Sequence, residues 1–277
     1  MAQPGSALEW GSRGRWFESS RSDGKGDWIE FQSPLLFYIS AISDVLKESD
    51  CMTYDIVIPA YNAQTSLPKL LESIRRLPQK PQSIIVVDDG STDDTAQVAS
   101  GFEDVEVIRL TSNRGKGQAL RSGMKHFLQH HSGDFLLLMD ADGQHAAESI
   151  PLFLKHAETN RFDIIIGHRS RKVGVMPLAR IFSNTMSSLI TSWVVGQKIL
   201  DSQCGFRLLR RSVVQEIPLT EDGFQIETEL IVKAAKRGFS IGFVPIPTIY
   251  NGEKSYIKHV NDTMHFLNII LKELVHS

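Results

Sequence analysis

From residue 52 onward, short apolar runs alternate with segments whose apolar residues recur at helical spacing. The apolar runs are residues 55–59, 83–87, 105–110 and 135–139, and the helical segments between them are residues 66–76, 93–100 and 117–128. Strands and helices that alternate in this way favour a mainly parallel sheet covered by helices on both faces. The pattern therefore predicts the α/β class.

Beyond residue 142 the pattern is looser. We expect a strand at 163–167, a long helix at 177–195, an unassigned region at 203–210, a helix at 227–237 and a strand at 241–245. The chain then ends in a segment whose apolar residues 260, 264, 267, 271 and 274 recur at helical spacing, as in an amphipathic helix. We therefore expect residues 52–277 to form one domain that ends in this helix.

Residues 1–51 differ in composition from the rest of the chain. They contain three of the four tryptophans, set among Gly, Ser and Arg without helical or strand periodicity. The run Trp16-Phe17-Glu18-Ser19 also matches the T-arm of a transfer-RNA gene translated in frame. We expect Met52 to be the natural start and residues 1–51 to be a non-native or disordered extension. The alternative is a disordered extension with a short helix near residues 34–47.

Charge and cysteine content exclude several classes of protein. The 30 basic and 32 acidic residues give a net charge of -2, which provides no overall electrostatic attraction for nucleic acid. Cys51 and Cys204 cannot build a disulfide framework, so we expect a reducing, cytoplasmic location, with Cys204 as a small buried side chain. No run reaches the roughly 18 to 20 apolar residues of a spanning helix.

Four polar loops follow the first four predicted strands. They comprise residues 59–62, 88–91, 113–117 and 140–144. Ligands of open α/β sheets bind at the carboxyl ends of the strands. We therefore expect these loops to face one crevice.

The loop after the fourth strand carries two carboxylates. Asp140 and Asp142 are two residues apart at an extended strand end, so both can project to the same side. Paired carboxylates favour a hard divalent cation, Mg²⁺ or Mn²⁺, and Gln144 could add a neutral oxygen. The alternative is a solvated turn in which Asp142 caps the following helix.

The glycines of the third loop match neither common phosphate-binding fingerprint. Leu120 stands where a dinucleotide fingerprint has its third glycine, and Lys116 is followed by Gly117 instead of Ser or Thr. Hydride transfer and ATP hydrolysis are thus disfavoured, and a flexible helix entry is the alternative reading of the loop.

Seven motifs, taken in order, connect the chain to a known family. They are Ile58-Pro59-Ala60-Tyr61-Asn62, Val87-Asp88-Asp89-Gly90-Ser91-Thr92-Asp93, Asn113-Arg114-Gly115-Lys116-Gly117, Met139-Asp140-Ala141-Asp142, Gly167-His168-Arg169, Cys204-Gly205-Phe206-Arg207, and Glu229-Leu230 before Val244-Pro245-Ile246. With them, residues 54–274 resemble family 2 glycosyltransferases of the GT-A fold. The similarity is greatest to the dolichol-phosphate, or polyprenyl-phosphate, mannosyl- and glucosyltransferases.

The resemblance implies a set of binding residues. The residues that would bind the nucleotide sugar are Pro59, Tyr61, Asn62, Val87, Asp89, Lys116, Asp140, Ala141, Asp142 and Arg169. Within this set, Pro59, Tyr61, Val87 and Asp89 would hold the base and ribose. Asp140, Ala141 and Asp142 would hold the diphosphate through the metal, with Gln144 as a third metal contact. Arg169, Arg180 and Lys254 would contact the acceptor phosphate, although the arginine that the family has just before Lys254 is missing.

The expected reaction is an inverting transfer of a hexose from GDP-mannose, UDP-glucose or a similar donor to polyprenyl phosphate. A lipid phosphate is already ionised near neutral pH, so it needs positioning arginines and no strong base. With a saccharide hydroxyl as acceptor, Asp201 is the candidate for the base or for orienting the acceptor. Asp142, Asp201 and Arg169 are therefore the candidate catalytic residues.

Two further functions are weaker alternatives. A sugar-nucleotide nucleotidyltransferase would usually carry a glycine-rich loop after the first strand, where this chain has Ala60-Tyr61-Asn62. A non-catalytic binding protein is disfavoured because Asp140 and Asp142 are both intact.

The two amphipathic helices and three polar residues complete the expectations. We expect the apolar stripes of 177–195 and of the terminal helix to pack in the core, the alternative being a peripheral position on the cytoplasmic membrane surface. His130 and His131 read as a solvated helix end, and Glu229 either bonds site residues or faces solvent.

Overall fold

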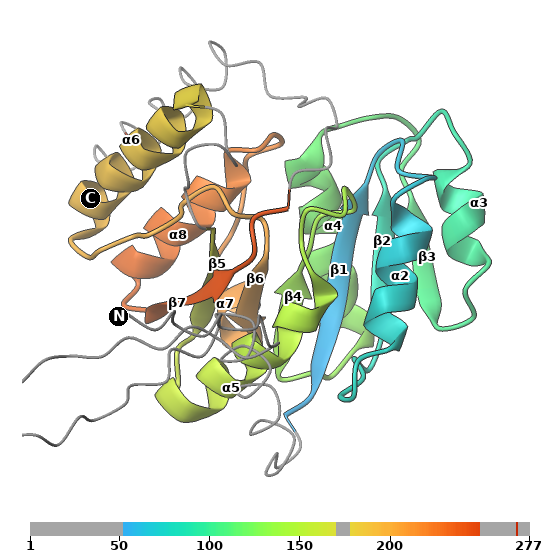
Figure 1. The fold of residues 1–277 in the computed structure, drawn as a ribbon, viewed down its shortest axis with the longest axis horizontal. Coiled ribbons are helices and arrows are strands. Elements are labelled where there is room, and N and C mark those ends of the chain that lie inside the picture. The colour runs from blue at the N-terminus through green and yellow to red at the C-terminus, as the bar shows by residue number, and fades with distance from the viewer. Residues whose placement is uncertain (1–51, 170–177, 250–269, 271–277) are drawn as a thin grey trace, which may run out of the picture. The chain divides into compact units, whose positions relative to one another are not determined.

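A seven-stranded sheet with the order β3-β2-β1-β4-β6-β5-β7 forms the centre of the molecule (Figure 1). The structure, a computed structural model, describes residues 52–169, 178–249 and 270, and for residues 178–180 it describes the backbone alone. The strands are β1 (Tyr54–Ala60), β2 (Ile84–Asp88), β3 (Val105–Arg109), β4 (Phe135–Leu138), β5 (Ile164–Arg169), β6 (Arg207–Arg210) and β7 (Ile241–Ile246). Only β6 of these strands runs antiparallel to its neighbours.

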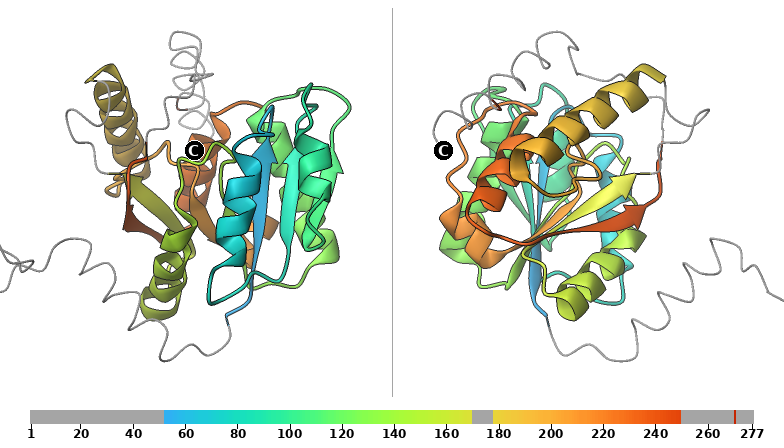
Figure 2. Two further views of the ribbon diagram at one scale, coloured as in Figure 1. Left: turned by 45° about the vertical axis from the view of Figure 1, so that its right-hand side comes forward. Right: turned by 90° about the vertical axis from the view of Figure 1, so that its left-hand side faces the viewer.

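The helices follow the strands as the sequence pattern indicates. They are α2 (Leu67–Arg75), α3 (Thr95–Ser100), α4 (Lys116–His130), α5 (Ile150–Asn160) after a 3₁₀ turn (Ala147–Ser149), α6 (Leu178–Val195), α7 (Arg211–Glu216) and α8 (Ile226–Lys236). Helices α2 and α4 lie on opposite faces of the sheet (Figures 1 and 2). The expected single α/β domain with a mainly parallel sheet between helices is thus confirmed.

Burial explains why these segments take these forms. The β1 residues are buried except for the partly exposed Pro59, as expected for a strand covered on both faces. On α2 the buried residues Leu67, Leu70, Leu71 and Ile74 recur at helical spacing. Helix α4 lies close to the sheet at Gly123, where a Cβ atom would come within 2.5 Å of Val57.

Three elements were not expected from the sequence. Helices α5 and α7 fall in segments to which no element was assigned, and β6 is antiparallel. The N-terminal extension of residues 1–51 and the C-terminal amphipathic helix lie outside the described residues, apart from Ile270. Ile270 belongs to a small apolar cluster with Val232 of α8 and with Ile190, Val194 and Val195 of α6.

Helix α6 has its polar side turned inward. Asn184, Ser187, Ser188 and Thr191 are buried, whereas four large apolar residues are exposed. These are Phe182 (69%), Met186 (40%), Leu189 (59%) and Trp193 (77%). Their spacing of four, three and four residues places them on one face of the helix. Core packing was therefore the wrong expectation for Phe182, Leu189 and Trp193, whereas Ile190 of the same expected stripe packs in the apolar cluster with Val232. In the described part of the chain, no helix has the length and hydropathy of a membrane span.

Candidate functional site

A cavity of about 600 Å³ lies at the carboxyl ends of the strands. It is lined by Pro59, Ala60, Tyr61, Asn62, Ala63, Thr65, Ser66, Asp89, Asn113, Gly115, Lys116, Ala119, Asp140, Ala141, Asp142 and Phe224. All four predicted loops contribute to this lining, so the expectation that they face one crevice is confirmed. A second cavity of about 480 Å³ shares Thr65, Ser66 and Asp142 with the first.

The loops after β1 and β2 are tied together at Asn62. Its backbone has a φ of 51°, in the left-handed region that asparagine tolerates well. Its side-chain oxygen accepts a hydrogen bond from the Thr92 N–H at 2.9 Å, and its own N–H donates to Ser91 Oγ at 2.9 Å. These bonds fix the floor of the cavity beside Tyr61.

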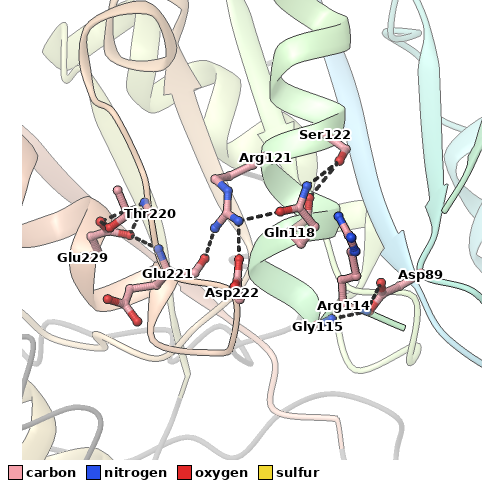
Figure 3. Close-up of polar contacts among 10 residues, drawn as sticks. All are labelled: Asp89, Arg114, Gly115, Gln118, Arg121, Ser122, Thr220, Glu221, Asp222 and Glu229. Atoms are coloured by element: carbon pink, nitrogen blue, oxygen red, sulfur yellow. Dashed lines mark hydrogen bonds and ion pairs between the residues drawn. The ribbon is translucent and has the colours of Figure 1, made fainter. Parts of the chain in front are cut away.

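Asp89 and Asp222 accept hydrogen bonds from N–H groups at the start of α4. The Asp89 carboxylate accepts hydrogen bonds from the N–H groups of Arg114 and Gly115, both at 2.8 Å (Figure 3). The Gly117 N–H donates to the carbonyl oxygen of Asp222 at 2.7 Å. A phosphate cradle needs such N–H groups to be free. The glycine loop at residues 113–117 therefore has a structural role, because its N–H groups connect the start of α4 to Asp89 and Asp222.

The segment that supplies Asp222 is itself held by α8. Glu229 is buried, and its carboxylate accepts hydrogen bonds from the N–H groups of Thr220 and Glu221 at 3.0 Å (Figure 3). Arg121 of α4 bonds the Glu221 carbonyl and the Asp222 carboxylate. Of the two expectations for Glu229, the solvent-facing one is thus wrong, because this side chain braces the loop beside the cavity.

Lys116 lies between two carboxylates. Its Nζ is 2.5 Å from Asp140 Oδ1 and 2.7 Å from Glu227 Oε1. Burial is the largest influence on Asp140 and raises its pKa, but the charge and hydrogen bond of Lys116, together with His145 and Arg169, outweigh burial and hold the pKa of Asp140 below its usual range. Gly205 packs against this pair, since a Cβ atom there would be 2.5 Å from Asp140 Oδ2 and 2.8 Å from Lys116 Nζ.

His145 lies behind Asp140. Its Nδ1 is 3.3 Å from the Asp140 N–H, and its ring stacks on Phe206 with the centroids 5.1 Å apart. Burial lowers the pKa of His145 to about 4, so the ring is neutral near pH 7. A neutral ring can accept this N–H, and His145 therefore helps to set the backbone from which Asp140 and Asp142 project.

Arg169 and Asp201 pair with each other. Arg169 donates from Nε to Asp201 Oδ2 at 2.8 Å and from Nη2 to Oδ1 at 3.0 Å, and the Asp201 side chain is only 1% exposed. A carboxylate held in a bidentate arginine contact is suited to orienting the guanidinium. The nearby Cys204 is buried, as expected, and burial raises the pKa of its thiol to about 12, which makes it a poor nucleophile.

The remaining predicted residues lie elsewhere. Val87 is fully buried and packs against α4 at Gly123, away from the cavity. Asp142 Oδ1 accepts the Gln144 N–H at 2.9 Å, but Gln144 is not among the described residues that line either cavity. The side chain of Arg180 and the whole of Lys254 lie outside the described residues.

Sequence analysis missed two buried residues near the site. Glu227 is the second anion bound to Lys116, and Arg207 is fully buried. Arg207 donates to the carbonyl oxygens of Ser202, Cys204 and Glu227 at 2.6–2.8 Å. Arg207 was quoted as part of a motif, and the signal that could have marked its burial is an arginine flanked by the apolar residues Phe206, Leu208 and Leu209.

Comparison with solved structures defines the fold. Glucosyl-3-phosphoglycerate synthase from Mycobacterium tuberculosis, crystallised with UDP, superimposes with a TM-score of 0.65 over 85% of this chain and 83% of that chain, at 19% identity. A structure described as the same synthase with Mn²⁺, UDP-glucose and phosphoglyceric acid gives a TM-score of 0.65 at 18% identity, over the same shares. The fold is that of GT-A glycosyltransferases.

Sequence comparison then gives the family. The family described as "Glycosyl transferase family 2" matches residues 55–218, and the chain belongs to this family of glycosyltransferases. An uncharacterized protein of Methanocaldococcus jannaschii, MJ1222, is 33% identical over 200 residues, which are 70% of this chain and 81% of the relative. Glycosyltransferase AglJ of Haloferax volcanii is 30% identical over 192 residues, 69% of this chain and 61% of AglJ. Family membership favours glycosyl transfer over the nucleotidyltransferase and binding-protein alternatives.

Proposed function

We propose that the protein transfers a hexose, with inversion and with the help of a divalent metal, from a nucleotide sugar to polyprenyl phosphate at the cytoplasmic membrane surface. The observation that carries this proposal is that Asp140 and Asp142 line the same cavity as Tyr61 and Asp89. A volume of about 600 Å³ lies within the usual range for ligand pockets. The donor would therefore enter at the carboxyl ends of β1, β2 and β4.

The donor type is inferred from the fold and the lining. The synthase of M. tuberculosis named above is described in complex with UDP-glucose and Mn²⁺, which supports a nucleotide sugar here. Pro59, Tyr61 and Asn62 provide apolar and amide groups on the β1 side of the cavity. We assign the base and ribose to this side, and GDP-mannose and UDP-glucose are the donors to test first.

The residues at the cavity fit a hard divalent cation. Asp140 and Asp142 offer carboxylate oxygens on one wall, which is the donor chemistry that Mg²⁺ and Mn²⁺ prefer. When bound, the metal would stabilise the negative charge that develops on the departing nucleoside diphosphate. Lys116 keeps Asp140 ionised and fixes its orientation. Gln144, which does not line the cavity, is the weakest member of the predicted metal set.

Two observations support a lipid phosphate as the acceptor. Asp201 is buried and paired with Arg169, so it is poorly placed to take a proton from a hydroxyl. An ionised phosphate needs no such base, and Arg169, oriented by Asp201, would bind it. Arg180 and Lys254 stay proposed contacts to the same phosphate.

The second observation is the apolar face of α6. Phe182, Leu189 and Trp193 are exposed on the outer side, while Ser187 and Ser188 on the inner side bond Ser202, next to Asp201. The exposed face thus lies on the helix that abuts the Arg169–Asp201 pair. Apolar side chains presented in this way suit the headgroup region of a bilayer, where a polyprenyl phosphate resides.

The experiment is a transfer assay with a matrix of donors and acceptors. The full chain is given GDP-mannose or UDP-glucose with either a short polyprenyl phosphate or a saccharide, and with Mn²⁺ or EDTA. The proposal expects a hexosyl polyprenyl phosphate to form with Mn²⁺ and not with EDTA. NMR should show that the anomeric configuration of its sugar is inverted relative to that of the donor. Transfer to the saccharide alone would contradict the lipid acceptor, and a retained anomer would contradict inversion.

A further inference from the structure

Two histidines and a glutamate meet far from the catalytic cavity. Glu106 lies near the start of β3, His126 lies in α4, and His131 follows the last residue of α4. The start of α4 lines the cavity, and a helix of 15 residues is about 22 Å long. Among the described residues, this is a group whose ligand atoms all lie within 4.8 Å of one another. We call Glu106, His126 and His131 the α4–β3 cluster.

The distances in the α4–β3 cluster suit a small cation. Glu106 Oε2 is 2.7 Å from His126 Nε2, and Glu106 Oε1 is 3.3 Å from His131 Nε2. Ligands at about 2.0–2.1 Å from a tetrahedral zinc ion lie about 3.4 Å from one another. Small side-chain adjustments would therefore bring all three ligand atoms around one ion.

His131 supplies the second observation. Its Nε2 is buried and has no hydrogen-bond partner among the described residues, although it faces Glu106. The sequence-based view of His131 as solvated is thus wrong, since its side chain is only 14% exposed. The contact of its Nε2 with Glu106 Oε1 at 3.3 Å lacks hydrogen-bond geometry, and a cation bound between the two atoms would satisfy both.

A buried carboxylate stands behind His131, on the other side of the ring. Asp55 Oδ1 is 3.6 Å from His131 Nδ1 and accepts a hydrogen bond from Ser83 Oγ at 2.6 Å. The Asp55 side chain is fully buried. Histidines that bind a metal through one ring nitrogen commonly present the other to a carboxylate, which fixes the ring and its tautomer. Asp55 stands in that position.

We propose that Glu106, His126 and His131 bind Zn²⁺ or a similar transition-metal ion, at a site separate from the catalytic cavity. Such an ion links the edge strand β3 to the end of α4, with water in the fourth position, since the Glu106 and His126 side chains are 46% and 25% exposed. Imidazole ligands select Zn²⁺, Co²⁺ or Ni²⁺ over Mg²⁺. The site does not depend on the proposed transfer reaction.

The test titrates the full chain, freed of metal with EDTA and dialysed, with Zn²⁺ by calorimetry and with Co²⁺ by visible absorption. Excess Mg²⁺ is present throughout to occupy the carboxylates of the catalytic cavity. We expect one equivalent of Zn²⁺, the absorption bands of tetrahedral Co²⁺, and a higher melting temperature in the presence of Zn²⁺. An unmodified chain that binds no Zn²⁺ under these conditions would overturn the proposal.

Variants assign the ligands. Glu106→Gln and His126→Ala remove groups that are partly exposed, and each should weaken Zn²⁺ binding at least about tenfold. His130→Ala is the matched control, because His130 is exposed and touches only the His126 ring among the cluster residues. It should leave Zn²⁺ binding unchanged, as should Asp142→Ala. Equal Zn²⁺ affinity of Glu106→Gln, His126→Ala and the unmodified chain would overturn the assignment, as would a loss on His130→Ala.

Discussion

Replacing Lys116 by methionine tests how the candidate site is held together. The change keeps most of the unbranched apolar side chain but leaves Asp140 and Glu227 without the cation that lies 2.5 Å and 2.7 Å from them. The Lys116 and Glu227 side chains are 13% and 8% exposed. Breaking a buried ion pair by removing one partner costs about 3–5 kcal/mol, whereas an exposed pair is worth at most about 1 kcal/mol.

Because Asp140 is 23% exposed, we expect a loss at the low end, about 3 kcal/mol near pH 7. Lys116 lowers the pKa of Asp140 in the folded protein. The stabilisation is therefore present above the unfolded pKa of about 4 and is lost as the pH falls through the folded pKa. The difference between Lys116→Met and the unmodified protein should therefore stay nearly constant above about pH 5 and shrink as the pH is lowered below about 4.

Urea unfolding in EDTA at several pH values measures this difference. Lys125→Met is the matched control, since Lys125 is exposed on the same helix and its loss should cost less than about 0.5 kcal/mol. A loss below about 1 kcal/mol for Lys116→Met, or a loss that does not change with pH, would refute the reasoning.

Three further predictions concern other parts of the molecule. Arg169→Gln should destabilise the protein by about 3 kcal/mol, because it leaves the buried Asp201 unpaired, and the double change with Asp201→Asn should cost less than the two single changes together in urea unfolding. A chain that starts at Met52 should keep its melting temperature and its transfer rate, and a clear fall in either would show that residues 1–51 support the domain. Trp193→Ser with Leu189→Ser should reduce co-sedimentation with anionic lipid vesicles without lowering the melting temperature, since both side chains are exposed; unchanged sedimentation would count against the membrane-facing role of α6.

The parts of the fold that local pattern controls could be predicted from the sequence. Strands β1 to β4 and the helices between them have apolar runs and spacing that fix both their type and the edge where their loops meet. The cavity lining from Pro59 to Asp142 follows from that topology. Helix α7 has only 6 residues, and β6 has 4, so neither gives a clear period.

Long-range contacts could not be predicted in the same way. Lys116 and Glu227 are 111 residues apart and meet only because the loop before α8 folds back on the start of α4. The buried polar side of α6 depends on its bonds to Ser202, which no helical pattern reveals. His131 was read as solvated because its burial depends on Asp55, which lies 76 positions earlier on β1.

The central claim is that Asp140 and Asp142 serve a metal-assisted transfer, and steady-state transfer by Asp142→Ala tests it most directly. Removing leaving-group stabilisation should cost at least about 2.7 kcal/mol, a fall in rate of about a hundredfold, and EDTA should do the same to the unmodified protein. Asp94→Ala, at an exposed aspartate before α3, should keep full turnover. Undiminished transfer by Asp142→Ala in a folded protein, or full activity in EDTA, would contradict the account.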